Sequence, residues 1–182
     1  MKSLRLILPS LALAALTATG CFLISGQFLV KFDLSNVHVL SATQVTGVGI
    51  DLNTIDEYSK HKDNLKDLVD VAILGDFTNN GASAIDVEVW MVDEAAPTLT
   101  TAAAVRSAGV RVWGPFHLNA GATKKITWDE SAALFGAGKA PLLAQIKGDG
   151  IFTLYAVGPS TMTLYDFSIT NGKLIAVIDA GA

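Results

Sequence analysis

Residues that could carry out chemistry are few and far apart in this sequence. The three histidines, His38, His61 and His117, have no partner at the HxH or HxxxH spacing with which histidines commonly bind a metal ion. His61 stands between Lys60 and Lys62, which is typical of a solvated helix face, whereas the other two fall inside apparent strands. The histidines therefore predict no metal centre. A composite site that forms only in three dimensions is the alternative.

No nucleophile or phosphate-binding motif is complete. A GxSxG elbow is absent, and Gly138-Lys139 lacks both the earlier glycine and the following Ser or Thr that a phosphate-binding loop requires. Asp63, Asp67 and Asp70 lie close together without the spacing of a calcium-binding loop, and on a helix the neighbouring lysines would compensate them. We therefore expect no enzyme, no metal and no cofactor.

The three tryptophans are the best candidates for contact with a ligand or partner. Trp90 falls on the wet face of its strand if Val87 and Val89 point inward, and Trp113 and Trp128 lie in the next two expected strands. Exposed aromatic rings on a sheet can form a carbohydrate platform or a protein contact. The alternative is that a second sheet or a crossover segment covers them.

The start of the chain has the three parts of a secretory signal. A basic opening with Lys2 and Arg5 precedes the apolar stretch 6–18, and small residues then lead to Cys21. Cys21 is the only cysteine, so no disulfide can form within one chain.

This segment resembles a bacterial lipoprotein signal, whose lipobox ends in small residues before the cysteine that becomes the mature N-terminus. Ala18 takes the position where that family most often has Leu. The resemblance implies a diacylglycerol thioether on Cys21 and usually a further acyl chain such as palmitate on its amine. Each buried methylene contributes ~0.8 kcal/mol, so two or three chains anchor a protein firmly. Phe22 replaces the Asp that resembles an inner-membrane retention signal in enteric bacteria, which favours the outer membrane, on its periplasmic or surface face.

Two other interpretations of the opening segment stay open. One is a plain cleaved signal with an incidental cysteine. The other is an uncleaved anchor, because residues 6–30 carry no charge and about 20 apolar residues can span a bilayer. Pro9, Gly20, Gly26 and Gln27 interrupt that run.

Composition favours one folded domain, residues 21–182, after a signal peptide, residues 1–20. Removing Lys2 and Arg5 leaves 11 basic against 17 acidic residues, a net charge of −6. An acidic surface without a basic run argues against nucleic acid as a partner. With 51% hydrophobic and only 16% charged residues, disorder is not expected.

Alternation of apolar residues with polar residues or glycine dominates the rest of the chain. It predicts about nine strands, in the segments 28–32, 45–52, 68–77, 84–93, 109–118, 122–128, 150–158, 162–170 and 173–179. Turn residues at 78–83 and 119–121 suit hairpins, and Asn171-Gly172 predicts a type I′ hairpin. The pattern indicates an all-β fold, mainly an antiparallel β-sandwich with one or more short helices. Residues 76–92 are weakly similar to the strand-turn-strand of immunoglobulin-like sandwich domains.

Few helices are expected. Thr54 with Glu57 has the spacing of a capping box and predicts a helix through 54–67. Segments 100–109 and 138–146 suit short helical or irregular crossovers, and Asp129 could cap a turn through 130–135.

These observations predict a non-catalytic, lipid-anchored lipoprotein of the bacterial cell envelope that acts as a binding or structural and assembly module. Its expected partners are the membrane, through acylated Cys21, and another envelope protein or a glycan. The alternative is a glycan-binding or adhesin-like surface module that uses Trp90, Trp113 and Trp128.

Overall fold

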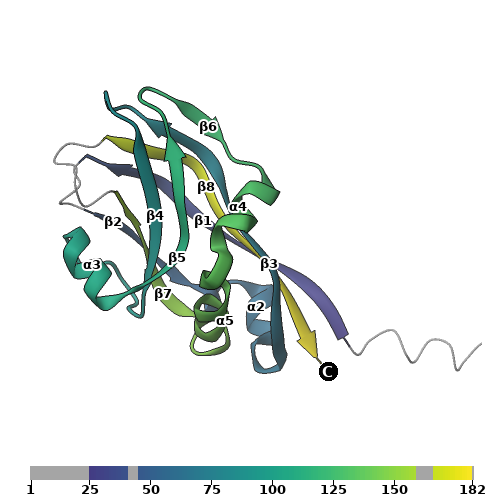
Figure 1. Cartoon of the computed structure of the whole chain (residues 1–182). Helices are drawn as coiled ribbons and strands as arrows, with labels where there is room; N and C mark the ends of the chain where they lie inside the picture. Colours follow the sequence, from purple (N-terminus) through teal and green to yellow (C-terminus); the bar gives the residue numbers. More distant parts are fainter. Residues whose placement is uncertain (1–24, 41–44, 159–165, 182) are drawn as a thin grey trace, which may run out of the picture.

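The structure of the chain, a computed structural model, describes residues 25–40, 45–158 and 166–181 (Figure 1). The signal-like segment and Cys21 lie outside these residues. The acylation of Cys21 therefore stays a prediction.

Two four-stranded antiparallel sheets make up the fold. Sheet A has the order β1-β8-β3-β6, and sheet B has the order β2-β7-β4-β5. The strands are β1 (Ser25–Val39), β2 (Thr46–Asp51), β3 (Leu65–Asn79), β4 (Ile85–Val92), β5 (Val110–Leu118), β6 (Thr123–Lys125), β7 (Ile151–Val157) and β8 (Phe167–Gly181). The expected all-β antiparallel sandwich with short helices is confirmed.

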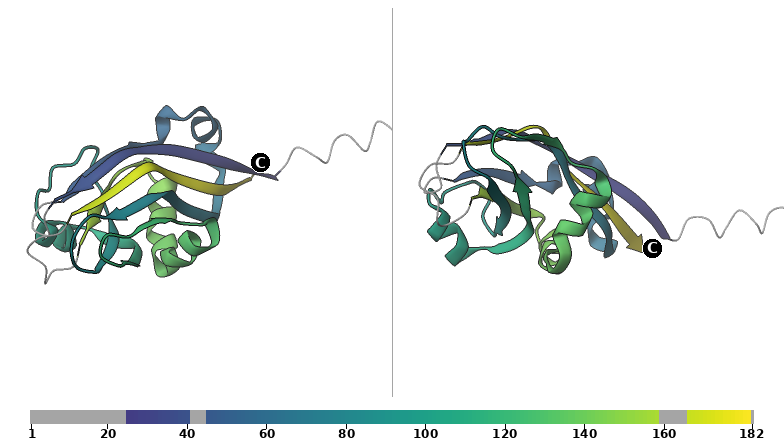
Figure 2. Two further views of the ribbon diagram at one scale, coloured as in Figure 1. Left: turned by 90° about the horizontal axis from the view of Figure 1, so that it is seen from above. Right: turned by 45° about the horizontal axis from the view of Figure 1, so that its top comes forward.

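Short helices fill the connections between strands. They are η1 (Leu52–Thr54), α2 (Asp56–His61), η2 (Lys62–Asn64), α3 (Ala102–Ala108), α4 (Trp128–Phe135), η3 (Gly136–Gly138) and α5 (Lys139–Lys147). Seen from above in Figure 2, β1 runs along one margin of sheet A, and α4 and α5 lie towards the opposite margin. One margin of the sheet is thus flanked by α4 and α5, and the other is formed by β1, with α2 beside it.

The core lies between the sheets, where the alternating apolar residues meet. Val87 and Val89 of β4 are buried, as their alternation predicts. At the centre, Phe77 of β3 stacks on Trp113 of β5 with ring centroids 5.6 Å apart, and Phe116 lies against both rings. These aromatic rings join the two sheets.

The predicted hairpin at Asn171-Gly172 is wrong. Residues 167–181 form the single strand β8, which pairs with β1 on one side and with β3 on the other. Asn171 does take the positive φ that the sequence suggested, 56°, but it uses it in an irregularity of the ladder, where its side chain donates to Asp76 Oδ2 at 3.1 Å. Because β8 has a strand partner on each side, it continues through Asn171-Gly172, where an isolated pair of strands would form a turn.

The turns at 78–83 and 119–121 are not hairpins either, because both connect sheet A with sheet B. Buried Asn79 holds the two crossings together: its amide donates to Ser83 O at 2.8 Å and to Asn119 O at 3.0 Å. A backbone bond from Gly121 N to Gly81 O, 3.2 Å long, ties them further. One amide side chain therefore satisfies carbonyls that no strand partner reaches.

The helix expected from Thr54 is shorter than predicted. It spans only Asp56–His61 and has no side-chain cap at its N-terminus, since the Thr54 hydroxyl donates to Asp51 O at 2.7 Å. Asp67, which falls within the expected helix, belongs to β3 together with Asp70, and each carboxylate accepts a hydrogen bond from the next backbone N–H. Both accompany register shifts of β3 against β8.

The helical crossovers at 100–109 and 138–146 are confirmed as α3 and α5. Helix α4 begins at Trp128, where a strand was expected, and Thr127 is its N-cap in place of Asp129. Thr127 and Glu130 form a complete capping box. The Lys124 ammonium and the Thr127 donors hold the pKa of the Glu130 carboxyl at about 2, so the box stays charged at neutral pH.

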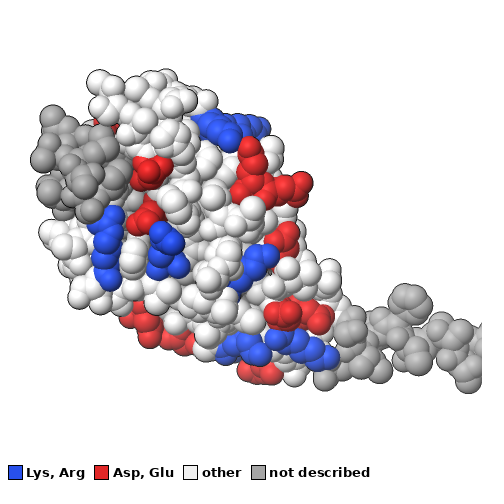
Figure 3. Space-filling model, viewed as in Figure 1, with Lys and Arg blue, Asp and Glu red and all other residues white. Residues whose placement is uncertain are grey.

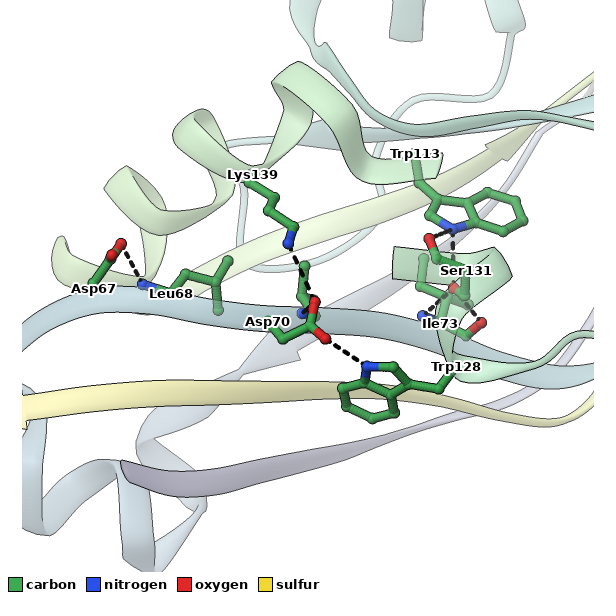
Figure 4. Close-up of polar contacts among 9 residues, drawn as sticks. Asp67, Leu68, Asp70, Ile73, Trp113, Trp128, Ser131 and Lys139 are labelled. Carbon is green, nitrogen blue, oxygen red and sulfur yellow. Dashed lines mark hydrogen bonds and ion pairs between the residues drawn. The ribbon is translucent and has the colours of Figure 1, made fainter. Parts of the chain in front are cut away.

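Ser131 of α4 joins three elements in the interior (Figure 4). It is fully buried, and its hydroxyl donates to Ile73 O at 2.8 Å and accepts from Ile73 N at 2.8 Å. The Trp113 indole N–H donates to Ser131 O at 3.0 Å and to its hydroxyl at 3.1 Å. Strand β6 pairs with residues 76–78 of β3, so at Ile73 the hydroxyl acts in place of a neighbouring strand.

We predict that Ser131→Ala lowers the free energy of unfolding by about 1–3 kcal/mol, because it leaves the buried N–H and C=O of Ile73 without partners. Urea unfolding measures the loss. Ser107→Ala, at an exposed serine of α3, is the matched control and should change stability by less than about 0.5 kcal/mol. Equal midpoints for the two variants would contradict this role of Ser131.

Candidate functional site

The three tryptophans do not form a shared exposed face. Trp113 is 1% exposed and belongs to the core. Trp90 lies on β4 of sheet B, whereas Trp128 begins α4 and hydrogen-bonds Asp70 of sheet A. The common platform on which the glycan interpretation depended is therefore not present.

Trp90 belongs to a polar cluster on the outer side of sheet B. Its indole N–H donates to Glu88 Oε2 at 3.0 Å, and the same carboxylate accepts from Arg111 at 2.8 Å and lies 3.7 Å from Arg106. Burial alone would raise the pKa of the Glu88 carboxyl, but the Arg111 and Trp90 hydrogen bonds and the two guanidinium charges outweigh it and lower that pKa. The ring itself packs beside the apolar cluster under α3. These groups satisfy one another and position α3 on the sheet.

Trp128 is part of a similar arrangement at β3 (Figure 4). Asp70 Oδ2 accepts from its indole N–H at 2.6 Å, and Asp70 Oδ1 accepts from Lys139 at 3.2 Å. Burial opposes ionisation of Asp70, yet the bonds from Trp128, Lys139 and the Val71 backbone lower its pKa overall. The carboxylate ties the starts of α4 and α5 to the strand, which is a structural task.

The histidines stay apart in three dimensions. His38 pairs with Asp166 at 2.8 Å, His117 pairs with Asp86 at 2.9 Å, and the His61 ring lies 4.9 Å from that of Phe28. Across the described ranges, no group of three or more His, Cys, Asp or Glu residues could hold a metal ion.

A groove of about 260 Å³ lies between β5 and the α4–η3 segment. Glycines and alanines make up much of its wall, and its charged side chain, Arg111, is already bonded to Glu88. The groove thus lacks convergent polar side chains with which to recognise a small ligand.

Charge does not mark a site on the face shown in Figure 3. Basic and acidic side chains alternate there, and no large area carries one sign. This face therefore does not indicate a strongly charged partner.

The feature that stands out is the outer edge of β1. This strand is fifteen residues long and, among the residues that the structure describes, pairs with a strand, β8, on one side only. The other edge strands are shorter: β2 has six residues, β6 has three and β5 has nine, with Gly138 of η3 packed directly on the backbone at Val112. A long unpaired edge presents a row of backbone donors and acceptors to a further strand.

Side chains of β1 divide cleanly between its two faces. Val30 points into the core, whereas Gln27, Leu29 and Lys31 are exposed on the outer face of sheet A. Leu29 is 52% exposed and lies beside Val177 of β8. An apolar side chain therefore stands at the middle of the most regular part of the edge.

Sequence reasoning found a strand at 28–32 but not its position in the sheet. Alternation shows that one face is buried, and it carries no information on which strands lie at an edge. The interruption-free run from Gln27 to Phe32 was the available signal, since it lacks proline and carries one charge, Lys31.

Comparisons with known proteins identify no family for this chain. No family model matches it, and no curated protein matches its sequence. Among solved structures, it is similar to dimeric latent PorU from Porphyromonas gingivalis, with 10% identity and a TM-score of 0.31. That alignment covers 87% of this chain and 13% of PorU. Within the part of the chain that the structure describes, no helix has the length and apolar character needed to cross a membrane.

We predict that Glu88→Gln lowers the free energy of unfolding at neutral pH by roughly 1–3 kcal/mol, because Glu88 is only 18% exposed and charge-assisted bonds are lost. The folded-state pKa lies below the usual 4.5, so this contribution is complete above that pH and disappears as pH falls through the lowered pKa. Urea unfolding from neutral pH to about pH 3 should therefore show a shallower acid loss in Glu88→Gln than in the wild type.

Glu57→Gln serves as the control, since its carboxylate is 56% exposed and 3.9 Å from Lys60. It should follow the wild-type curve. A Glu88→Gln curve parallel to that of the wild type would show that this carboxylate does not support the fold.

Proposed function

We propose that this chain is a non-catalytic, lipid-anchored lipoprotein of the bacterial envelope, and that it binds a protein partner through the free edge of β1. The observation that carries the proposal is that this edge strand begins only a few residues after Cys21 in the chain. Cys21 precedes Ser25, the first residue of β1, by four residues, a span of at most about 14 Å. An acylated Cys21 would hold the edge close to the membrane surface.

A protein strand is the partner chemistry that an edge suits best. Backbone hydrogen bonds supply affinity in such pairing, and alternate side chains supply specificity. The exposed outer face of β1, with Leu29 between Gln27 and Lys31, offers one apolar and two polar contacts for that purpose. Two of the histidines are engaged in separate pairs, His38 with Asp166 and His117 with Asp86, and this separation is compatible with a binding role.

We do not propose the glycan-binding alternative for this chain. It required Trp90, Trp113 and Trp128 to share an exposed face, and each indole N–H is instead bonded to a group of the chain itself.

We predict that Cys21→Ser moves the protein out of the membrane fraction and abolishes incorporation of labelled palmitate, because the thiol is the acyl acceptor. Phe22→Asp is the matched control: it keeps the thiol, so the protein should stay labelled and membrane-bound, with a shift towards the inner membrane in an enteric host. Unchanged membrane binding of Cys21→Ser, with residues 1–20 still attached by mass spectrometry, would refute the anchor.

We also predict that a photo-crosslinking amino acid at Leu29 captures a protein in intact cells far more efficiently than one at Val110. Both side chains are about half exposed, at 52% and 49%, and both lie on edge strands, but in different sheets. Capture at equal levels, or at neither position, would contradict binding through β1.

A further inference from the structure

We propose that the partner of this edge is a second copy of the chain, with the two β1 strands antiparallel and centred on Leu29. The inference rests on the β1 edge of the proposed function and is independent of acylation. Two four-stranded sheets A would then join into one continuous sheet across a two-fold axis.

The first part of β1 is a regular template. From Ser25 opposite Gly181 to Asp33 opposite Lys173, its register against β8 advances without a shift, and the first irregularity follows Asp33. Because backbone groups of a strand alternate in direction, the side facing away from β8 is equally regular over residues 25–33. Bulges, which commonly blunt an edge, start only beyond this stretch.

The start of this stretch is sterically accessible, and helix α2 contacts it through His61, whose ring lies 4.9 Å from that of Phe28. Its end projects with the end of β8 beyond sheet B and the helices (Figure 1). A side chain added at Gly26 would meet nothing within 4 Å. In an antiparallel pair the two bodies extend in opposite directions from the shared segment, which keeps them apart.

Pairing centred on Leu29 matches each side chain with a suitable neighbour. The exposed Leu29 side chains of the two copies meet on the outer face, in line with Val177 of each β8. Phe32 lies opposite Gly26 and covers its open backbone, an arrangement known to rescue glycine in edge strands. On the outer face, Lys31 lies opposite the neutral Gln27.

Other symmetric registers fit less well. Centring on Lys31 sets that ammonium directly against its own copy, which is destabilising. Centring on Val30 sets each Leu29 opposite a Lys31 and leaves the apolar side chains without apolar partners. The register centred on Leu29 avoids both defects.

This arrangement is compatible with two anchors in one membrane. The two Ser25 residues lie eight positions apart along the paired strands, about 27 Å, on either side of the two-fold axis. Both Cys21 residues could therefore enter the same leaflet while the joined sheet lies along it.

Disulfide trapping tests the contact directly. Directly opposed residues in antiparallel strands have Cα atoms about 4.5–5.5 Å apart, within the range that a disulfide spans. In a full-length Cys21→Ser background, where it is the only thiol, Leu29→Cys should give a disulfide-linked homodimer under mild oxidation in intact cells. Val110→Cys in the same background should stay monomeric.

Gln27 variants test the register, since each dimer contains two Gln27–Lys31 pairs. For the purified protein, sedimentation equilibrium should show Gln27→Glu tightening and Gln27→Lys weakening association, each by about 2- to 30-fold. The two variants alter one exposed position and leave the fold unchanged, as circular dichroism verifies. Changes of the same sign would overturn the register.

The outcomes separate this inference from the proposed function. A wild-type protein that sediments as a monomer, while the crosslinker at Leu29 captures a different protein, overturns self-pairing and leaves the binding edge intact. Homodimer trapping at Leu29 in the non-acylated background supports self-pairing whatever the fate of Cys21.

Discussion

The fold depends on how β3 is completed where its neighbouring strand ends. Strand β6 is three residues long, so the edge of β3 beyond it would expose buried backbone groups to an apolar interior. The Ser131 hydroxyl supplies both a donor and an acceptor to Ile73, and its own carbonyl accepts the Trp113 indole N–H. A single residue, Ser131, therefore connects sheet A, sheet B and α4. At the opposite margin, β1 has no strand partner on its outer side among the described residues, although the His61 ring of α2 lies against its Phe28.

The sequence predicted the fold class and the buried face of most strands, because period-two alternation is set by burial alone. The prediction failed where the same local sequence pattern can form two different structures. Thr54 and Thr127 both precede a glutamate by three residues, yet only Thr127 forms a capping box. At Thr54 the upstream Asp51 carboxylate captures the Asn53 N–H at 2.9 Å and starts a 3₁₀ turn. Competition from an upstream side chain, not the motif, decides where the helix begins.

The candidate site was predictable only in part, and the tryptophans show why. The glycan hypothesis required them to share one exposed face, but their indole N–H groups are bonded to Ser131, Glu88 and Asp70, on three different elements. An indole N–H that is shielded from water requires an acceptor. Trp90 finds one two residues away, whereas Trp113 and Trp128 are bonded to residues 18 and 58 positions away in the sequence. The β1 edge was missed for the converse reason: its importance comes from strand order, which depends on the crossings at residues 78–83 and 119–121 rather than on β1 itself.

An anchor and a free edge support each other physically. A solvent-exposed strand edge in a freely diffusing protein encounters partners in any orientation, and unrestricted pairing leads to aggregation. Under our proposal, a tether at Cys21, four residues before the strand, would restrict both the orientation and the position of the edge, and would raise the effective concentration of copies held in one membrane. Lys31 adds a second restriction, since it penalises the register in which the strands meet at that residue. Under our proposal, the short connection between Cys21 and β1 is therefore part of what makes pairing specific: lengthening it would leave the edge intact but reduce the advantage of copies already held side by side.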